Sequence, residues 1–132
     1  MKPISAKITK ALQAGSFINC ADNSGATLLQ IIAIKGYKGV KSRFPRCGIG
    51  DWIFAAVKEG DSKIVHEVVQ AIIIRQKKEY KRPNGIRVKF EDNSAVLINE
   101  KGEPRGSKIK GAVAREVIER FSTIGKIATF VV

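Results

Sequence analysis

The chain has 132 residues, of which 24 are Lys or Arg and 12 are Asp or Glu, so its formal net charge is +12 at pH 7. A hydrophobic fraction of 44% beside 27% charged residues is typical of a globular protein and excludes a purely disordered basic tail. No apolar run approaches the roughly 18 residues that a membrane-spanning helix needs, and the N-terminal residues lack the hydrophobic stretch of a signal peptide. The sequence therefore predicts one folded domain over residues 1–132, cytoplasmic and without a membrane partner.

Two hairpins are predicted in the first half of the chain. In each, two runs rich in apolar and β-branched residues are separated by a turn signal, where Asp and Asn bond their own backbone and Gly takes positive φ. The predicted strands are residues 17–20 and 27–34 around Asp22-Asn23-Ser24-Gly25, then residues 52–57 and 64–74 around Gly60-Asp61-Ser62.

A third hairpin is predicted between residues 86–90, where apolar and basic residues alternate, and residues 95–99. After these strands the hydrophobic period changes to that of a helix beginning near Ala112, followed by a short second turn over residues 122–128. Val113, Val117, Ile118 and Phe121 form its apolar face, and Arg115, Glu116, Glu119 and Arg120 form its polar face. Several short strands and one docked helix predict a mainly β protein, a small barrel or sandwich.

The positive charge is concentrated in three segments that contain turn-forming Gly, Pro or Asn: residues 35–46, 75–89 and 101–115. Together they hold seventeen basic and two acidic residues, whereas the rest of the chain holds seven basic and ten acidic residues. The two alternatives are solvated faces that keep the protein soluble and a footprint for a polyanion. Three nearly acid-free clusters favour the polyanion.

Aromatic residues within the basic segments suggest contact with nucleic acid. Tyr37, Phe44 and Tyr80 could stack on bases beside phosphate contacts, and for Tyr37 and Phe44 packing that anchors the basic loop is an equal alternative. Trp52, Phe54 and Phe121 lie in apolar patterns and are expected in the core.

Catalytic and metal-binding patterns are absent from the sequence. Cys20 and Cys47 lack the spacing of a zinc site, and His66, the only histidine, has no recognisable nucleophile or carboxylate beside it. We therefore predict no metal, no cofactor and no enzymatic activity. Two rival functions stay open: a DNA-binding module on a basic barrel, and an RNA-processing enzyme that uses Asp22, Asp51 or His66.

Four stretches, in order along the chain, resemble the universal large-subunit ribosomal protein fourteen family. They are CADNSGA at residues 20–26, GDWIFAAVKEG at 50–60, VKFEDNSAVLIN at 88–99 and GSKIKGAVARE at 106–116. The segment KGYKGVKSRFP and the length of 132 residues resemble the archaeal and eukaryotic branch.

The resemblance implies a five-stranded β-barrel with a β-ribbon extension and a short C-terminal helical segment. It also implies a structural role on the intersubunit face of the large ribosomal subunit. The implied partners are large-subunit ribosomal RNA, neighbouring large-subunit ribosomal proteins, small-subunit ribosomal RNA at intersubunit bridges, and an anti-association initiation factor.

Matching positions and charge together predict the residues that contact RNA. We expect arginines to bind phosphates in bidentate fashion and lysines to act as point charges. The predicted residues are Lys35, Lys38, Lys41, Arg43 and Arg46 in the first segment, Arg75, Lys77, Lys78, Lys81 and Arg82 in the second, and Arg105, Lys108, Lys110 and Arg115 in the third.

Overall fold

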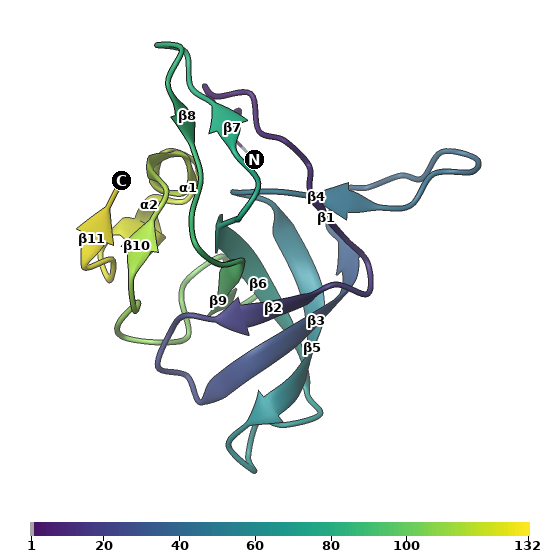
Figure 1. Ribbon diagram of the computed structural model, residues 1–132. Coiled ribbons are helices and arrows are strands. Elements are labelled where there is room, and N and C mark those ends of the chain that lie inside the picture. Colours follow the sequence, from purple (N-terminus) through teal and green to yellow (C-terminus); the bar gives the residue numbers. More distant parts are fainter. Residues whose placement is uncertain (1) are drawn as a thin grey trace.

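Five strands close into a β-barrel in the computed structural model, which describes residues 2–132 (Figure 1). Around the barrel the order is β2-β3-β5-β6-β9. All neighbouring pairs are antiparallel except β2 and β9, which close the ring in parallel. The barrel strands are β2 (Phe17–Cys20), β3 (Ala26–Ile34), β5 (Trp52–Gly60), β6 (Val68–Arg75) and β9 (Ser94–Ile98). The predicted fold class is confirmed.

The barrel interior is filled by branched aliphatic side chains from alternate strand positions. In β3 and β5, Leu29, Ile31, Ile53 and Val57 are almost completely buried, as the alternating pattern of these strands requires. Burial of each such side chain contributes about 1.5–3 kcal/mol. The strand β9 is buried at every position, which shows that other elements cover its outer face.

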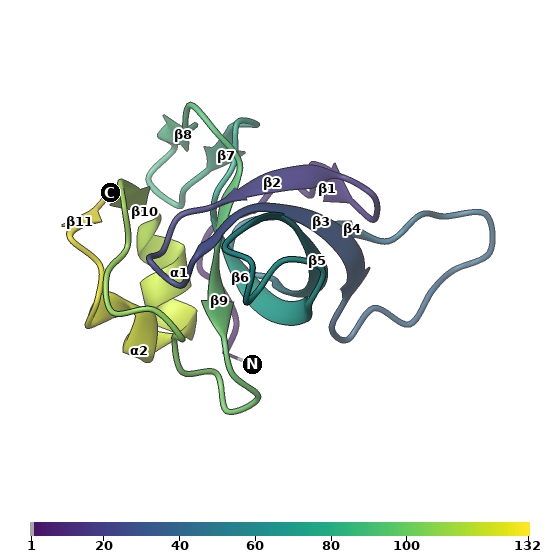
Figure 2. The ribbon, with the colours of Figure 1, turned by 90° about the horizontal axis from the view of Figure 1, so that it is seen from below.

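The remaining elements are short pairs and helices around the barrel. In Figure 2 the segment of residues 35–46, here called the projecting loop, extends away from the barrel. No helix among residues 2–132 is long and apolar enough to cross a membrane. The pairs are β1 (Leu12–Gln13) with β4 (Arg46–Cys47), β7 (Tyr80–Lys81) with β8 (Arg87–Val88), and β10 (Ala112–Val113) with β11 (Phe130–Val131); the helices are α1 (Arg115–Arg120) and α2 (Ser122–Gly125).

The first predicted hairpin is confirmed as β2 and β3, but the third is wrong. The strand β8 pairs with β7, through a turn in which the Asn84 side chain accepts a hydrogen bond from the Ile86 N–H and Gly85 has φ +88°. β7, β8 and their turn form the ribbon. After β8 the chain passes into the barrel as β9, beside β6. The alternation in residues 86–90 was a real strand signal, but it did not identify the partner.

Two predicted boundaries also differ from the structure. The strand β6 begins at Val68 rather than residue 64, because the Ile64 and Val65 N–H groups both bond to the Asp61 carbonyl and make a longer turn. The helix begins at Arg115 rather than near Ala112, because residues 112–113 pair with the C-terminal strand β11. The short second helical turn is confirmed as α2.

Candidate nucleic-acid interface

The projecting loop presents its basic side chains to solvent. Lys38, Lys41, Arg43 and Arg46 are exposed, and none has an ion-pair partner among the residues described, 2–132. Lys35, at the base of the loop, places its ammonium 3.7 Å from the centroid of the Trp52 ring, a cation–π contact. The projecting loop therefore carries four exposed cations that have no ion-pair partner in the described part of the chain and are available to bind an external anion.

The aromatic residues of the basic segments have three different environments. The Tyr37 hydroxyl donates to the Phe44 carbonyl at 3.4 Å, so Tyr37 links the two sides of the projecting loop. Phe44 itself is 75% exposed and therefore does not anchor the loop through its ring. Tyr80 is completely buried, so the expectation that it could stack on a base is wrong.

Arg75, predicted to bind phosphate, is directed into the protein. Its side chain is 12% exposed, and its Nε lies 2.7 Å from Asp92 Oδ1. Its Nη1 donates to the Lys110 and Ala112 carbonyls at 3.0 and 2.8 Å, and its Nη2 donates to Asp92 at 3.2 Å. Because all three guanidinium nitrogens are engaged within the chain, Arg75 holds the third basic segment in place rather than offering a free fork to RNA.

The Arg75–Asp92 contact makes folding stability depend on pH at the acid end. The hydrogen bond from Arg75 lowers the pKa of Asp92 from 3.8 to about 2, with a further contribution from Ser94. A carboxyl with a lowered pKa in the folded state stabilises the fold above its unfolded pKa and loses that contribution as the pH falls. We expect the free energy of unfolding to decrease from pH 4 to pH 2 and Asp92→Asn to reduce this decrease, measured by denaturant titration at each pH. The control Glu91→Gln, at an exposed neighbour, should keep the wild-type dependence; an unchanged dependence in Asp92→Asn would contradict the assignment.

Arg82, in the turn of the ribbon, also has its guanidinium group bound within the protein. Its Nε lies 2.7 Å from Glu116 Oε1, its Nη2 donates to the Val132 carbonyl at 2.6 Å, and its side chain is 12% exposed. The Tyr80 hydroxyl donates to Glu116 Oε2 at 2.9 Å, and the Glu116 side chain is only 3% exposed. The sequence predicts Glu116 on the polar face of the helix but does not predict its burial in this cluster, because its partners Tyr80 and Arg82 are distant in the sequence. The cluster joins the ribbon to α1 and to the C-terminus.

The third basic segment contains a loop that is held from two sides, residues 106–111, here called the clasped loop. The Asn23 side chain accepts the Ser107 N–H at 2.9 Å and donates to the Ser107 hydroxyl at 2.8 Å, and the Lys110 N–H donates to the Ala21 carbonyl at 2.6 Å. From the other side Arg75 holds the carbonyl of Lys110. A Cβ on Gly106 would lie 2.8 Å from Asn23 Oδ1, so a larger residue here would displace the Asn23 side chain that holds Ser107.

The clasped loop and its neighbours carry the exposed cations Lys108, Lys110 and Arg115, which have no carboxylate partner within residues 2–132. Arg105 differs, since it lies 3.6 Å from Glu67 in a surface ion pair. Lys108 and Lys110 thus lie on a loop whose backbone is held by hydrogen bonds, and Arg115 is the first residue of α1.

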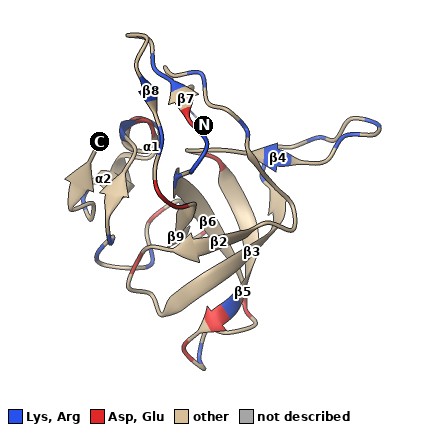
Figure 3. Cartoon of the chain, in the orientation of Figure 1, with Lys and Arg blue, Asp and Glu red and all other residues tan. Residues whose placement is uncertain are grey.

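The N-terminal segment, residues 2–10, adds lysines that the three-segment description left out. The available signal was that residues 1–21 contain no acid, although their charge density is too low to stand out. Lys7 is exposed beside the ribbon, whereas Lys10 lies 2.6 Å from the buried Asp51. Figure 3 shows basic residues on the projecting loop, the ribbon and the N-terminal segment, while most of the barrel strands are uncharged.

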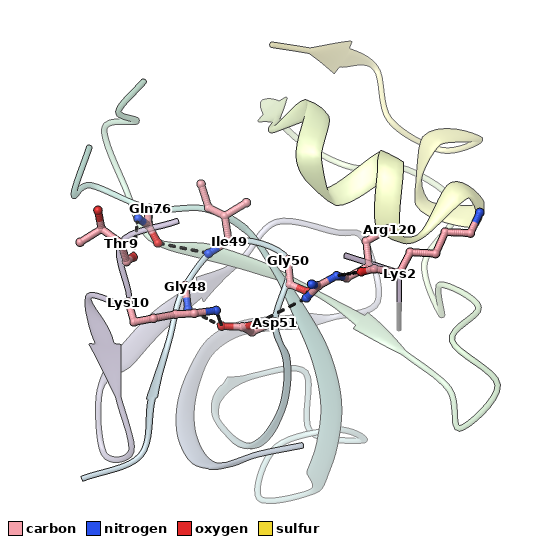
Figure 4. Close-up of polar contacts among 9 residues, drawn as sticks. All are labelled: Lys2, Thr9, Lys10, Gly48, Ile49, Gly50, Asp51, Gln76 and Arg120. Atoms are coloured by element: carbon pink, nitrogen blue, oxygen red, sulfur yellow. Dashed lines mark hydrogen bonds and ion pairs between the residues drawn. The ribbon is translucent and has the colours of Figure 1, made fainter. Parts of the chain in front are cut away.

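The residues considered for catalysis have structural partners or lie apart in turns. Asp22 accepts hydrogen bonds from the Ser24 and Leu97 N–H groups, and Asp51 accepts from the Gly48 N–H at 2.7 Å (Figure 4). His66 is exposed in the turn before β6. Burial raises the pKa of the Cys20 and Cys47 thiols to about 12, which keeps them protonated and poorly nucleophilic. Within residues 2–132 no three His, Cys, Asp or Glu side chains are grouped to hold a metal ion.

Within residues 2–132 the barrel carries unpaired cations on the projecting loop, the ribbon and the clasped loop. This arrangement is typical of a structural protein that binds a polyanion. The sequence profile of the family described as ribosomal protein L14p/L23e matches residues 11–132. Large ribosomal subunit protein uL14 of Methanocorpusculum labreanum is 51% identical over 132 residues, and those of Halorubrum lacusprofundi and Methanothrix thermoacetophila are 49% and 48% identical; every alignment covers both chains completely. The chain therefore belongs to the L14p/L23e family. It is a structural ribosomal protein and not an enzyme, as predicted.

Proposed function

We propose that the chain binds folded large-subunit ribosomal RNA and takes its place in the large subunit by neutralising phosphates. The observation that supports this proposal is the set of exposed cations without an intramolecular carboxylate. They lie in three separate places on one rigid barrel, which suits recognition of RNA shape rather than of a single base sequence. The predicted residues that belong to this set are Lys35, Lys38, Lys41, Arg43 and Arg46 on the projecting loop, Lys77 and Lys81 at the ribbon, and Lys108, Lys110 and Arg115 at or near the clasped loop.

The remaining predicted residues divide into two groups. Lys78 and Arg105 form surface ion pairs with Glu79 and Glu67, which are weak enough to exchange for phosphate contacts. Arg75 and Arg82 act as positioning residues, because their guanidinium groups hold the clasped loop and the ribbon. Phe44, exposed between Arg43 and Pro45, supplies a ring on which an unpaired base can stack.

The assembled surface also suits a place between the two subunits. The family resemblance supports contacts with neighbouring ribosomal proteins, with small-subunit RNA at intersubunit bridges, and with an anti-association initiation factor. In this proposal the projecting loop reaches RNA away from the barrel, and the clasped loop presents cations without needing to order on binding.

Binding to large-subunit ribosomal RNA should depend steeply on salt. If about 6–10 phosphates are neutralised, affinity should fall by roughly 10³–10⁵ between 50 and 200 mM salt. The double variant Lys38→Glu and Arg43→Glu should bind more weakly and should lower the salt slope by about 0.7–0.9 for each lost phosphate contact, measured by filter binding.

The matched control is Lys58→Glu with Lys63→Glu, which reverses two exposed lysines around the turn between β5 and β6. It should keep the wild-type slope. A flat salt response of the wild-type protein would contradict phosphate neutralisation, and equal affinity for duplex DNA at the same ionic strength would favour the DNA-binding alternative.

A further inference from the structure

Three cationic residues lie in one row across three adjacent chain segments. Lys7 of the N-terminal segment is paired with Lys81 of β7, and its N–H donates to the Lys81 carbonyl at 3.1 Å. On the other side of β7, Lys81 is paired with Arg87 of β8. Residues directly opposite in antiparallel pairs direct their side chains to the same face. Lys7, Lys81 and Arg87 therefore share one face of the ribbon and of the N-terminal segment bridged to it, which runs beside β7 in Figure 1.

One carboxylate of the described residues, that of Glu79, lies near the row and does not balance its three positive charges. All three side chains are exposed, and none forms an ion pair within residues 2–132. Glu79 precedes β7 and lies 3.2 Å from Lys78. Its own backbone hydrogen bond, then Lys78 and, to a smaller extent, Arg87 lower the pKa of its carboxyl. Like charges placed directly opposite each other destabilise a sheet. Beside a single carboxylate the row therefore keeps a net positive charge, and the arrangement indicates an external anion.

The opposite face of the ribbon explains why the row points outward. Tyr80, one position before Lys81, is buried and bonds to Glu116 of α1, while its cross-strand neighbour Val88 is half-buried. Because successive side chains of a strand alternate between faces, the packing of Tyr80 against α1 directs Lys81 to solvent. The ribbon is thereby held in one orientation before any ligand binds.

Side-chain hydrogen bonds also hold the N-terminal segment in place. The Gln76 amide donates to the Thr9 carbonyl at 3.0 Å, and the Thr9 hydroxyl donates to the Glu79 carbonyl at 3.0 Å. These contacts, two residues from Lys7, hold the N-terminal segment beside the ribbon. The family profile begins at residue 11, so Lys7 lies outside the part of the chain that the profile describes.

We propose that Lys7, Lys81 and Arg87 bind consecutive phosphates of one ribosomal RNA strand; this site rests on the proposed function and adds Lys7 and Arg87 to it. Neighbouring strands lie about 4.8 Å apart, so the row extends about 10 Å. Because the backbone winds around the helix axis, neighbouring phosphates lie farther apart than the axial rise of about 3.4 Å per nucleotide in duplex DNA, so a row of this length suits three consecutive phosphates. The row contains no apolar side chain, whereas the centres of protein interfaces are depleted of charge, which favours a nucleic-acid strand over a protein segment.

The test compares the double variant Lys7→Gln and Arg87→Gln with the control Lys58→Gln and Lys63→Gln, which removes the same charge from the turn between β5 and β6. Binding to large-subunit ribosomal RNA is measured by filter binding between 50 and 200 mM salt. We expect the double variant to lower the salt slope by about 0.7–0.9 for each of the two phosphates, and the control to keep the wild-type slope. Because like-charge repulsion is relieved, the melting temperature of the free double variant should equal or exceed that of wild type at low salt.

The possible results separate this site from the general proposal. Strong wild-type binding with equal slopes for the two double variants would overturn the phosphate row and leave RNA binding intact. Unchanged RNA binding with loss of an acidic protein neighbour from the assembled subunit would also overturn it, in favour of a protein partner. Absence of RNA binding by wild type would overturn both proposals. A lowered melting temperature of the double variant would show that the row serves folding.

Discussion

Replacement of Glu116 by alanine is expected to lower the free energy of unfolding by about 3–5 kcal/mol, the range for loss of one partner from a buried ion pair. The Glu116 carboxylate binds the Arg82 guanidinium and the Tyr80 hydroxyl, and its side chain is 3% exposed. Its removal leaves a largely buried arginine charge and a buried hydroxyl without their acceptor. Denaturant titration, with the midpoint and slope fitted together, measures the loss.

The matched control for this prediction is Glu119→Ala on the same short helix. Glu119 is exposed and accepts a hydrogen bond from the Ser5 hydroxyl, so its loss should cost less than about 1 kcal/mol. Equal effects of the two variants would show that the buried cluster does not connect the ribbon to α1 in solution.

Replacement of Asp51 by alanine is expected to cost about 2–3 kcal/mol and to release the N-terminal segment, because a buried N–H group loses its acceptor. Asp51 accepts hydrogen bonds from Lys10 and from the Gly48 N–H, and its other oxygen lies 3.7 Å from Arg120 (Figure 4). The loss is smaller than for Glu116, since the Lys10 side chain is 45% exposed and can be hydrated. Amide hydrogen exchange at Lys7, whose N–H bonds to β7, reports the release directly.

The control Lys10→Ala removes one partner and leaves the Gly48 N–H bonded to Asp51, so it should cost about 1 kcal/mol or less. Faster exchange at Lys7 in Asp51→Ala, with little change in the barrel amides, is the expected pattern. Uniformly faster exchange would instead indicate global destabilisation, and unchanged exchange at Lys7 would contradict a role for Asp51 in holding the N-terminal segment.

The barrel could be predicted from the sequence because its strands carry local signals. In β3 and β5 the apolar runs end at turn residues, and these positions are strands in the structure. The pairing of β8 could not be predicted, because β7 contains only two residues and has no period of its own. A strand signal specifies a conformation, whereas the choice of partner depends on contacts distant in the sequence.

The binding surface was predicted at the level of segments but not of every side chain. Free cations on the projecting loop follow from a segment without acids. The Arg75 guanidinium group is bound by Asp92, seventeen residues away in the sequence, and the Arg82 guanidinium group is bound by Glu116, thirty-four residues away. Charge counts within a segment do not include such distant partners, so both arginines looked available.

The parallel contact between β2 and β9 has a consequence for synthesis of the protein. The ring closes only when Asn19 meets Ser94, and the Asp22 carboxylate receives the Leu97 N–H across 75 residues of sequence. Until that part of the chain has left the ribosome, β2 and β6 each present an unpaired edge, the kind of edge that promotes aggregation. Contacts of such long range also slow folding. A newly made chain therefore passes through an open-sheet stage in which the projecting loop is already synthesised but the barrel cannot yet close.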